Sequence, residues 1–147
     1  MIALKNLIPA AILALVLLIA GCGSDNNPTS GGSTGGGVKT DPSFAQDIQA
    51  TFNNRGCTGA GCHGTSSASA GLILVSGQAY GNLVNITSTN ESPKKRVLPG
   101  DAANSYIVNK IEGTQSVGGR MPLNAAALSA TDIQNIKNWI NQGAKNN

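Results

Sequence analysis

Three side chains with distinctive chemistry lie in one short segment near the middle of the chain. The segment Cys57-Thr-Gly-Ala-Gly-Cys62-His63 places two thiols before an imidazole, and His63 is the only histidine among 147 residues. Thiols form thioethers and disulfides and bind metals as thiolates, and a neutral imidazole is the commonest metal ligand in proteins. This spacing therefore predicts a site for a covalently held group or a metal ion.

The segment is close to the Cys-x-x-Cys-His pattern that is typical of c-type haem attachment. In such a site each thiol forms a thioether with a vinyl group of the porphyrin, and the histidine binds iron through Nε2. Here the spacer from Thr58 to Gly61 has four residues instead of two. A longer spacer must loop outward, and Gly59 and Gly61 suit such a loop because glycine adopts positive φ at no steric cost. We predict that Cys57 and Cys62 attach one haem c and that His63 is its proximal ligand.

Met121 is the candidate for the second axial ligand. It lies in the glycine- and proline-containing segment Gly118–Leu123 and is the only methionine besides Met1. A lone methionine more often fills a gap in a hydrophobic core. Because a haem motif precedes it and it lies in a loop, we favour Met121 as the distal ligand.

Residues 1–21 have the pattern of an export signal. Lys5 precedes the apolar run Leu7–Ala20, which is shorter than the roughly 20 residues needed to span a bilayer. The run ends in Ile19-Ala20-Gly21-Cys22, which resembles the lipobox of bacterial lipoproteins and implies cleavage before Cys22 and lipid attachment to its thiol. The alternative is an ordinary secretory signal with a coincidental cysteine. With lipid on Cys22 and haem on the other two, no cysteine is left over.

Composition divides the remainder into a linker and one domain. Residues 22–40 are rich in Gly, Ser, Thr and Asn and predict a flexible tether, and residues 41–147 are enough for one domain. Only 3% of the chain is aromatic and 19 residues are glycine, so a covalently held porphyrin would supply the centre of the core. The net charge of +3 falls to +2 without Lys5, with 9 Lys and Arg against 7 Asp and Glu, and nothing predicts binding to nucleic acid.

Apolar spacing and capping residues predict an all-α domain. We expect helices from about Asp41 to Asn54, from Ala102 to Glu112 after the N-cap Asp101, and from Ser129 to Gly143. The last helix carries the clearest apolar stripe, and Ser129 with Asp132 resembles a capping box. Trp139 on that stripe is expected to pack against the first helix.

The middle of the domain is less regular. Ser76 is expected to cap a short helix over Tyr80–Val84, and Leu72–Val75 predicts a short strand or an apolar loop. Residues 94–96 predict a solvated basic cluster, in which Arg96 is best placed to pair with a haem propionate.

The order of helix, haem motif, short helices, methionine loop and C-terminal helix resembles the class I cytochrome c family, in which the terminal helices cross beside the haem. More narrowly, the chain is similar to the monohaem lipoprotein cytochromes of bacteria. The similarity covers Asp41 to Asn147, and the four-residue spacer departs from the usual motif. The segments that carry it are Phe52-Asn-Asn-Arg-Gly-Cys57, Cys62-His63-Gly64, Leu98-Pro99-Gly100-Asp101, Gly119-Arg120-Met121-Pro122 and Trp139-Ile-Asn-Gln-Gly143.

The resemblance implies a one-electron carrier, not an enzyme, with His63 and Met121 as axial ligands. It implies transient docking to redox partner proteins and a membrane anchor at Cys22. Residue 23 is Gly and not Asp, which indicates the outer membrane of a bacterial envelope, with the domain in the periplasm or at the cell surface. Three alternatives stay open: a five-coordinate haem protein that binds small ligands, a zinc site that lacks a fourth ligand, and a binding lipoprotein with a Cys57–Cys62 disulfide.

Overall fold

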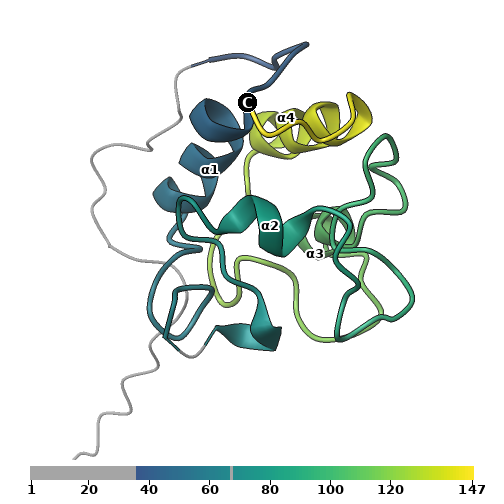
Figure 1. Ribbon diagram of the computed structural model, residues 1–147. Helices are drawn as coiled ribbons and strands as arrows, with labels where there is room; N and C mark the ends of the chain where they lie inside the picture. The colour runs from purple at the N-terminus through teal and green to yellow at the C-terminus, as the bar shows by residue number, and fades with distance from the viewer. Residues whose placement is uncertain (1–35, 67) are drawn as a thin grey trace, which may run out of the picture.

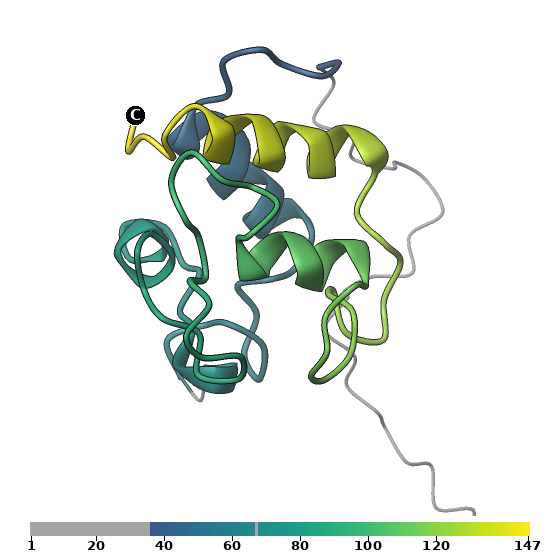
Figure 2. The same cartoon turned by 90° about the vertical axis from the view of Figure 1, so that its right-hand side faces the viewer.

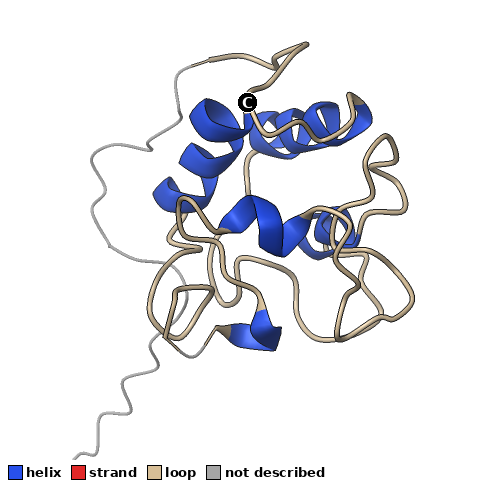
Figure 3. Cartoon of the chain, in the orientation of Figure 1, coloured by secondary structure: helices blue, strands red, loops and turns tan. Residues whose placement is uncertain are grey.

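The computed structural model describes residues 36–66 and 68–147, so the expected signal segment and Cys22 lie outside the described part. Within that part the regular secondary structure is helical, and long loops join the helices (Figures 1 and 3). Extended pairing there is limited to two isolated bridges, Val84 with Val97 and Thr87 with Lys95. The all-α class is therefore confirmed for these residues. None of the helices in this region is both long and apolar enough to cross a membrane.

The first helix forms where the apolar spacing predicts it. It begins with a π-helical turn, Phe44–Ile48, and continues as α1, Gln49–Asn54. Ser43 is the N-cap, and its Oγ accepts a hydrogen bond from the backbone N–H of Gln46 at 3.4 Å. The predicted apolar positions are all buried: Phe44, Ile48 and Phe52.

Helix α4, Ala130–Asn141, also begins as predicted. The Oγ of Ser129 accepts a hydrogen bond from the N–H of Asp132 at 3.0 Å, which satisfies one of the free donors at the helix start. The carboxylate of Asp132 instead binds the guanidinium of Arg55 at 2.6 Å. Gly143 follows the helix with a φ of 96°, and this left-handed conformation ends it as expected.

Helix α3 is shorter than predicted. It spans Tyr106–Glu112, with Ser105 as N-cap, so the expectation that it begins directly after Asp101 is wrong. The reason is local: Oδ1 of Asp101 accepts from the N–H of Asn104 at 3.0 Å and closes a separate turn. Gly113 ends the helix with a φ of 82°, as predicted.

Two short helical segments lie between the Cys57–His63 segment and α3. A 3-10 turn spans Ser69–Gly71, and α2 spans Ala79–Leu83. The N-cap of α2 is Gln78, and no side chain caps it, so the prediction of a cap by Ser76 is wrong. Leu72–Val75 forms no strand and runs as a loop.

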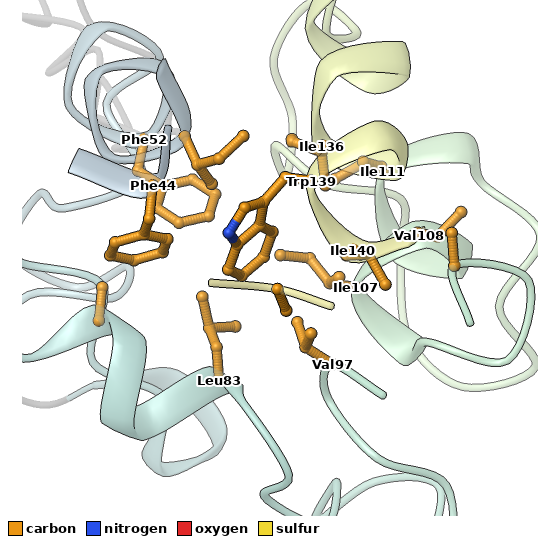
Figure 4. Close-up of a cluster of buried hydrophobic side chains, with 14 of the residues drawn as sticks. Phe44, Phe52, Leu83, Val97, Ile107, Val108, Ile111, Ile136, Trp139 and Ile140 are labelled. Carbon is orange, nitrogen blue, oxygen red and sulfur yellow. The ribbon is translucent and has the colours of Figure 1, made fainter. Parts of the chain in front are cut away.

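The core lies between the first helix, α2, α3 and α4, with Trp139 near its middle (Figure 4). The indole ring lies 5.2 Å from the ring of Phe44, centroid to centroid. Its Nε1–H donates to the carbonyl of Lys145 at 2.8 Å, so the polar atom of this buried side chain is satisfied. The predicted packing of Trp139 against the first helix is confirmed.

The residues just before the domain follow the outer face of α4. The N–H of Lys39 donates to Oδ1 of Asn135 at 2.7 Å, and Nδ2 of Asn138 donates to the carbonyl of Lys39 at 2.6 Å. Nε2 of Gln142 donates to the carbonyl of Thr40. Lys39 and Thr40, which their composition assigns to the linker, therefore pack against the domain.

Candidate functional site

The end of α1 leads directly into the Cys57–His63 segment. Arg55 is the C-cap, and the next residue, Gly56, has a φ of 68°. This left-handed residue turns the chain so that the N–H of Cys57 donates to the carbonyl of Phe52 at 3.0 Å. The side chain of Cys57 packs against the edge of the hydrophobic core. The first helix therefore fixes the position of the first cysteine.

The four-residue spacer folds into consecutive turns. The N–H of Cys62 donates to the carbonyl of Gly59 at 3.1 Å, and the N–H of His63 donates to the carbonyl of Cys57 at 3.0 Å. Gly61 has a φ of 80°, as the loop requires, whereas Gly59 does not adopt a positive φ. The two additional residues are thus taken up by the turns, and the backbones of Cys57 and His63 stay in contact.

The imidazole of His63 is half-buried and held in one orientation. Its Nδ1 lies 3.1 Å from the carbonyl oxygen of Leu72. A carbonyl only accepts hydrogen bonds, so Nδ1 carries the proton and Nε2 is the nitrogen that presents a lone pair. A hydrogen bond from the second nitrogen to a backbone carbonyl is the usual support of a metal-binding histidine.

The surroundings of His63 favour its neutral form. Burial lowers the pKa of the imidazole, and the positive charges of Arg96 and Lys110 lower it further, against the opposing effect of the Leu72 and Ser69 carbonyls. The neutral imidazole is the form that binds a metal ion.

The two cysteines differ in their surroundings. Burial raises the pKa of Cys57 to about 11, so its thiol is protonated at neutral pH. Cys57 is a free thiol, and the structure therefore contains no Cys57–Cys62 disulfide. Cys62 is buried, with 7% of its surface exposed. Across residues 36–66 and 68–147, no three His, Cys, Asp or Glu side chains form a group that could hold a metal ion.

Met121 lies on a second loop, between α3 and α4. Its N–H donates to the carbonyl of Lys110 at 2.8 Å, and Nζ of Lys110 donates to the carbonyl of Gly119 at 2.5 Å. The side chain of Arg120 stabilises the same loop, because its Nη2 donates to the carbonyl of Ala125 at 3.0 Å. The thioether side chain of Met121 is half-buried.

The loop with the two cysteines and the loop with Met121 lie on the same side of the molecule, away from α4 (Figures 1 and 2). The backbone carbonyl of Lys110 accepts from the N–H of Met121, and the charge of Lys110 makes a small contribution to the lowered pKa of His63. Cys57, Cys62 and His63 are thus on one short loop, and Met121 belongs to a separate loop between α3 and α4.

Arg96 is a residue of this region whose role the sequence did not reveal. It was expected to be solvated, but only 9% of its surface is exposed. Its guanidinium donates to the carbonyls of Ala70, Gly71 and Asn82, at 2.8, 3.4 and 2.9 Å. These bonds occupy three of the five N–H donors of an arginine, and pairing with a haem propionate stays a prediction. No pattern in the neighbouring sequence predicts that Arg96 is buried, because Arg96 follows two lysines in a polar segment.

The donor set of the loop fits a covalently attached haem. Two cysteines at the start and end of a compact turn would supply the sulfur atoms of two thioethers, and the adjacent imidazole would present Nε2 to an iron ion. In comparisons with known proteins, no family model matches the chain, and no curated protein and no solved structure matches it.

Proposed function

We propose that this protein is a one-electron carrier with a single covalent haem c. The observation that carries the proposal is the arrangement of Cys57, Cys62 and His63 on one hydrogen-bonded loop, with Nδ1 of His63 bound to the carbonyl of Leu72. This arrangement supplies both thioether-forming groups and an oriented axial ligand. A haem with two axial ligands supplies reversible one-electron chemistry between Fe(II) and Fe(III).

The cysteines and the histidine would hold the haem in different ways. Cys57 and Cys62, in their reduced form, would hold a haem through thioethers, in which each sulfur would bond to one vinyl carbon and its hydrogen to the other. The raised pKa of Cys57 keeps its S–H intact at neutral pH. The lowered pKa of His63 favours the neutral imidazole, and the hydrogen bond of Nδ1 to the carbonyl of Leu72 leaves Nε2 as the nitrogen without a proton.

Met121 is proposed as the second axial ligand. The support is that Lys110 interacts with both: its backbone carbonyl accepts from the N–H of Met121, and its charge lowers the pKa of His63. A methionine ligand raises the reduction potential. The positive charges of Arg96 and Lys110 act in the same direction, because they disfavour the more positive Fe(III) state.

The fold proposed with this function is that of the class I cytochromes c. The support is the packing of the first helix against α4, seen in the contact of Phe44 with Trp139 and in the ion pair of Arg55 with Asp132. In that family the terminal helices also cross. We propose further that Cys22, outside the described residues, anchors the protein by lipid to a bacterial envelope membrane and that its partners are redox proteins that dock transiently.

The test is the visible spectrum of the full chain, produced together with haem-maturation machinery. We expect covalent haem, sharp Soret and α bands on reduction, and the weak long-wavelength band of methionine-ligated Fe(III). Met121→Ala should abolish that band and lower the potential, and Leu123→Ala should not, because Leu123 is on the same loop with 40% of its surface exposed.

Each other outcome has a definite meaning. Covalent haem whose spectrum is the same in Met121→Ala would exclude Met121 and favour the five-coordinate, ligand-binding alternative. A chain that acquires no haem would overturn the proposed function.

A further inference from the structure

The guanidinium of Arg96 holds the 3-10 turn Ser69–Gly71. Nη2 donates to the carbonyl of Ala70 at 2.8 Å, and Nη1 donates to the carbonyl of Gly71 at 3.4 Å. Nη1 also donates to the carbonyl of Asn82 at 2.9 Å, which ties the turn to the end of α2. One buried cation therefore binds carbonyls from two segments that are distant in sequence.

The turn needs outside support. Ala70 has a φ of 54° and Gly71 a φ of 62°, so two consecutive residues are in the left-handed region. That region is sterically unfavourable for Ala70, which carries a Cβ. The conformation directs the carbonyls of both residues toward Arg96, and a hydrogen bond to a charged donor is stronger than one to a neutral donor.

The next residue of the same turn orients His63. Leu72 follows Gly71 directly, and its carbonyl accepts from Nδ1 of His63 at 3.1 Å. The N–H of Leu72 donates to the carbonyl of Ser69 at 3.1 Å, so the position of Leu72 depends on the turn Ser69–Gly71.

Arg96 is itself fixed by the backbone around it. Its N–H donates to the carbonyl of Ile86 at 2.7 Å, and its carbonyl accepts from the N–H of Ile107 in α3 at 3.0 Å. None of the ion pairs found in the described part of the chain involves Arg96. The guanidinium of Arg96 instead donates to backbone carbonyls. Arg96 therefore has a structural role at this position.

We propose that Arg96 is a positioning residue for His63. By holding the carbonyls of Ala70 and Gly71, it sets the carbonyl of Leu72 where it fixes the Nδ1–H of the imidazole, and so directs Nε2 toward the site of the iron. The role in iron ligation rests on the proposed function. The effect on the imidazole itself does not require haem.

The single histidine makes a direct test possible. The full chain is labelled with ¹⁵N-histidine, and the ring nitrogen signals of His63 are recorded without haem and, where haem attaches, with it. The variants are Arg96→Met, which removes the donors, and Arg96→Lys, which keeps the charge without spanning the carbonyls. The control is Arg120→Met, which removes the same charge from the Met121 loop.

We expect His63 in the unchanged chain to carry its proton on Nδ1. In Arg96→Met the ratio of this tautomer to the Nε2–H tautomer should fall about tenfold, the scale set by lost hydrogen bonds to a charged group. Arg96→Lys should give an intermediate ratio, and Arg120→Met should leave it unchanged.

Unchanged ring signals in folded Arg96→Met, checked by circular dichroism, would overturn the inference. If Arg96→Met does not fold, unchanged ring signals of His63 in Arg96→Lys would overturn the inference. A shift of the tautomer ratio in Arg96→Met, in a chain that never acquires haem, would support the positioning role of Arg96 and overturn the proposed function. Haem attachment together with an unchanged tautomer ratio in Arg96→Met would support the proposed function and overturn the positioning role of Arg96.

Discussion

Gly64, directly after His63, lies against the backbone of the spacer. Its N–H donates to the carbonyl of Gly59 at 3.2 Å. A Cβ at this position would lie 2.9 Å from the carbonyl oxygen of Thr58 and 3.1 Å from that of Gly59. Both atoms belong to the backbone, so they can move only if the spacer turn opens. The compact form of the six residues before His63 therefore depends on a glycine here.

Gly64→Ala should loosen the Cys57–His63 loop. We expect the free energy of unfolding to fall by about 1–3 kcal/mol, the usual cost of overpacking, and the fraction of protein that carries covalent haem to fall with it. Urea denaturation and the haem-to-protein absorbance ratio measure the two effects.

The matched control is Gly81→Ala in α2, where an added Cβ meets nothing within 4 Å. There alanine should be neutral or stabilise by about 0.5–1 kcal/mol, because glycine is unfavourable in a helix. Equal effects of the two substitutions would contradict the proposed tight packing at Gly64.

One ion pair joins the two terminal helices. Arg55, the C-cap of α1, binds Asp132 in the first turn of α4, with Nη2 and Oδ2 2.6 Å apart. The side chain of Asp132 is 7% exposed and that of Arg55 is 30% exposed, so solvent screens this pair only in part. Since Arg55 is two residues before Cys57, the contact also fixes the start of the Cys57–His63 segment relative to α4.

Asp132→Asn should lower the free energy of unfolding by about 1–3 kcal/mol, the range for hydrogen bonds to charged groups. The control is Glu112→Gln, which removes the pair of Lys137 with Glu112, where both side chains are about one-third exposed. That pair should contribute less than about 1 kcal/mol. Urea denaturation of both variants gives the comparison, and a larger loss in Glu112→Gln would contradict this ranking.

The molecule as a whole is organised around a protein core centred on Trp139. The indole is 1% exposed, and it contacts the first helix through Phe44 while its own helix also packs against α3. The low aromatic content suggested that a porphyrin would be the centre of the core. The structure instead places Cys57 and Leu72, two residues of the candidate site, at the edge of this cluster.

Trp139→Ala should therefore destabilise the entire domain by about 3–5 kcal/mol, the usual cost of removing a buried aromatic side chain. Trp139→Phe should cost less, because it keeps a ring and loses mainly volume and the bond to Lys145. Thermal denaturation followed by circular dichroism measures both changes. Val38→Ala, at a side chain that is 56% exposed, should change stability by no more than about 0.5 kcal/mol. A loss below about 1 kcal/mol in Trp139→Ala would contradict a core centred on this residue.

The amino-acid sequence alone determined the features that depend on neighbours in the chain. The ends of α3 and α4 at Gly113 and Gly143 and the cap at Ser129 were predicted because each needs only the residues within one turn of it. The candidate site was found for the same reason, since its two cysteines and histidine are close in sequence. The start of α3 was missed because Asp101 and Ser105 both have competing local hydrogen bonds.

Only the tertiary structure decided how distant segments meet. Three contacts join residues that no local sequence pattern relates. They are the ion pair of Arg55 with Asp132, the packing of Lys39 along α4, and the burial of Arg96 under the turn Ser69–Gly71. The partner of such a polar group depends on which segments the packed core brings together, because a buried donor must find an acceptor wherever the fold places it. The same holds for His63, whose ligating nitrogen is selected by the carbonyl that the fold presents to the other one.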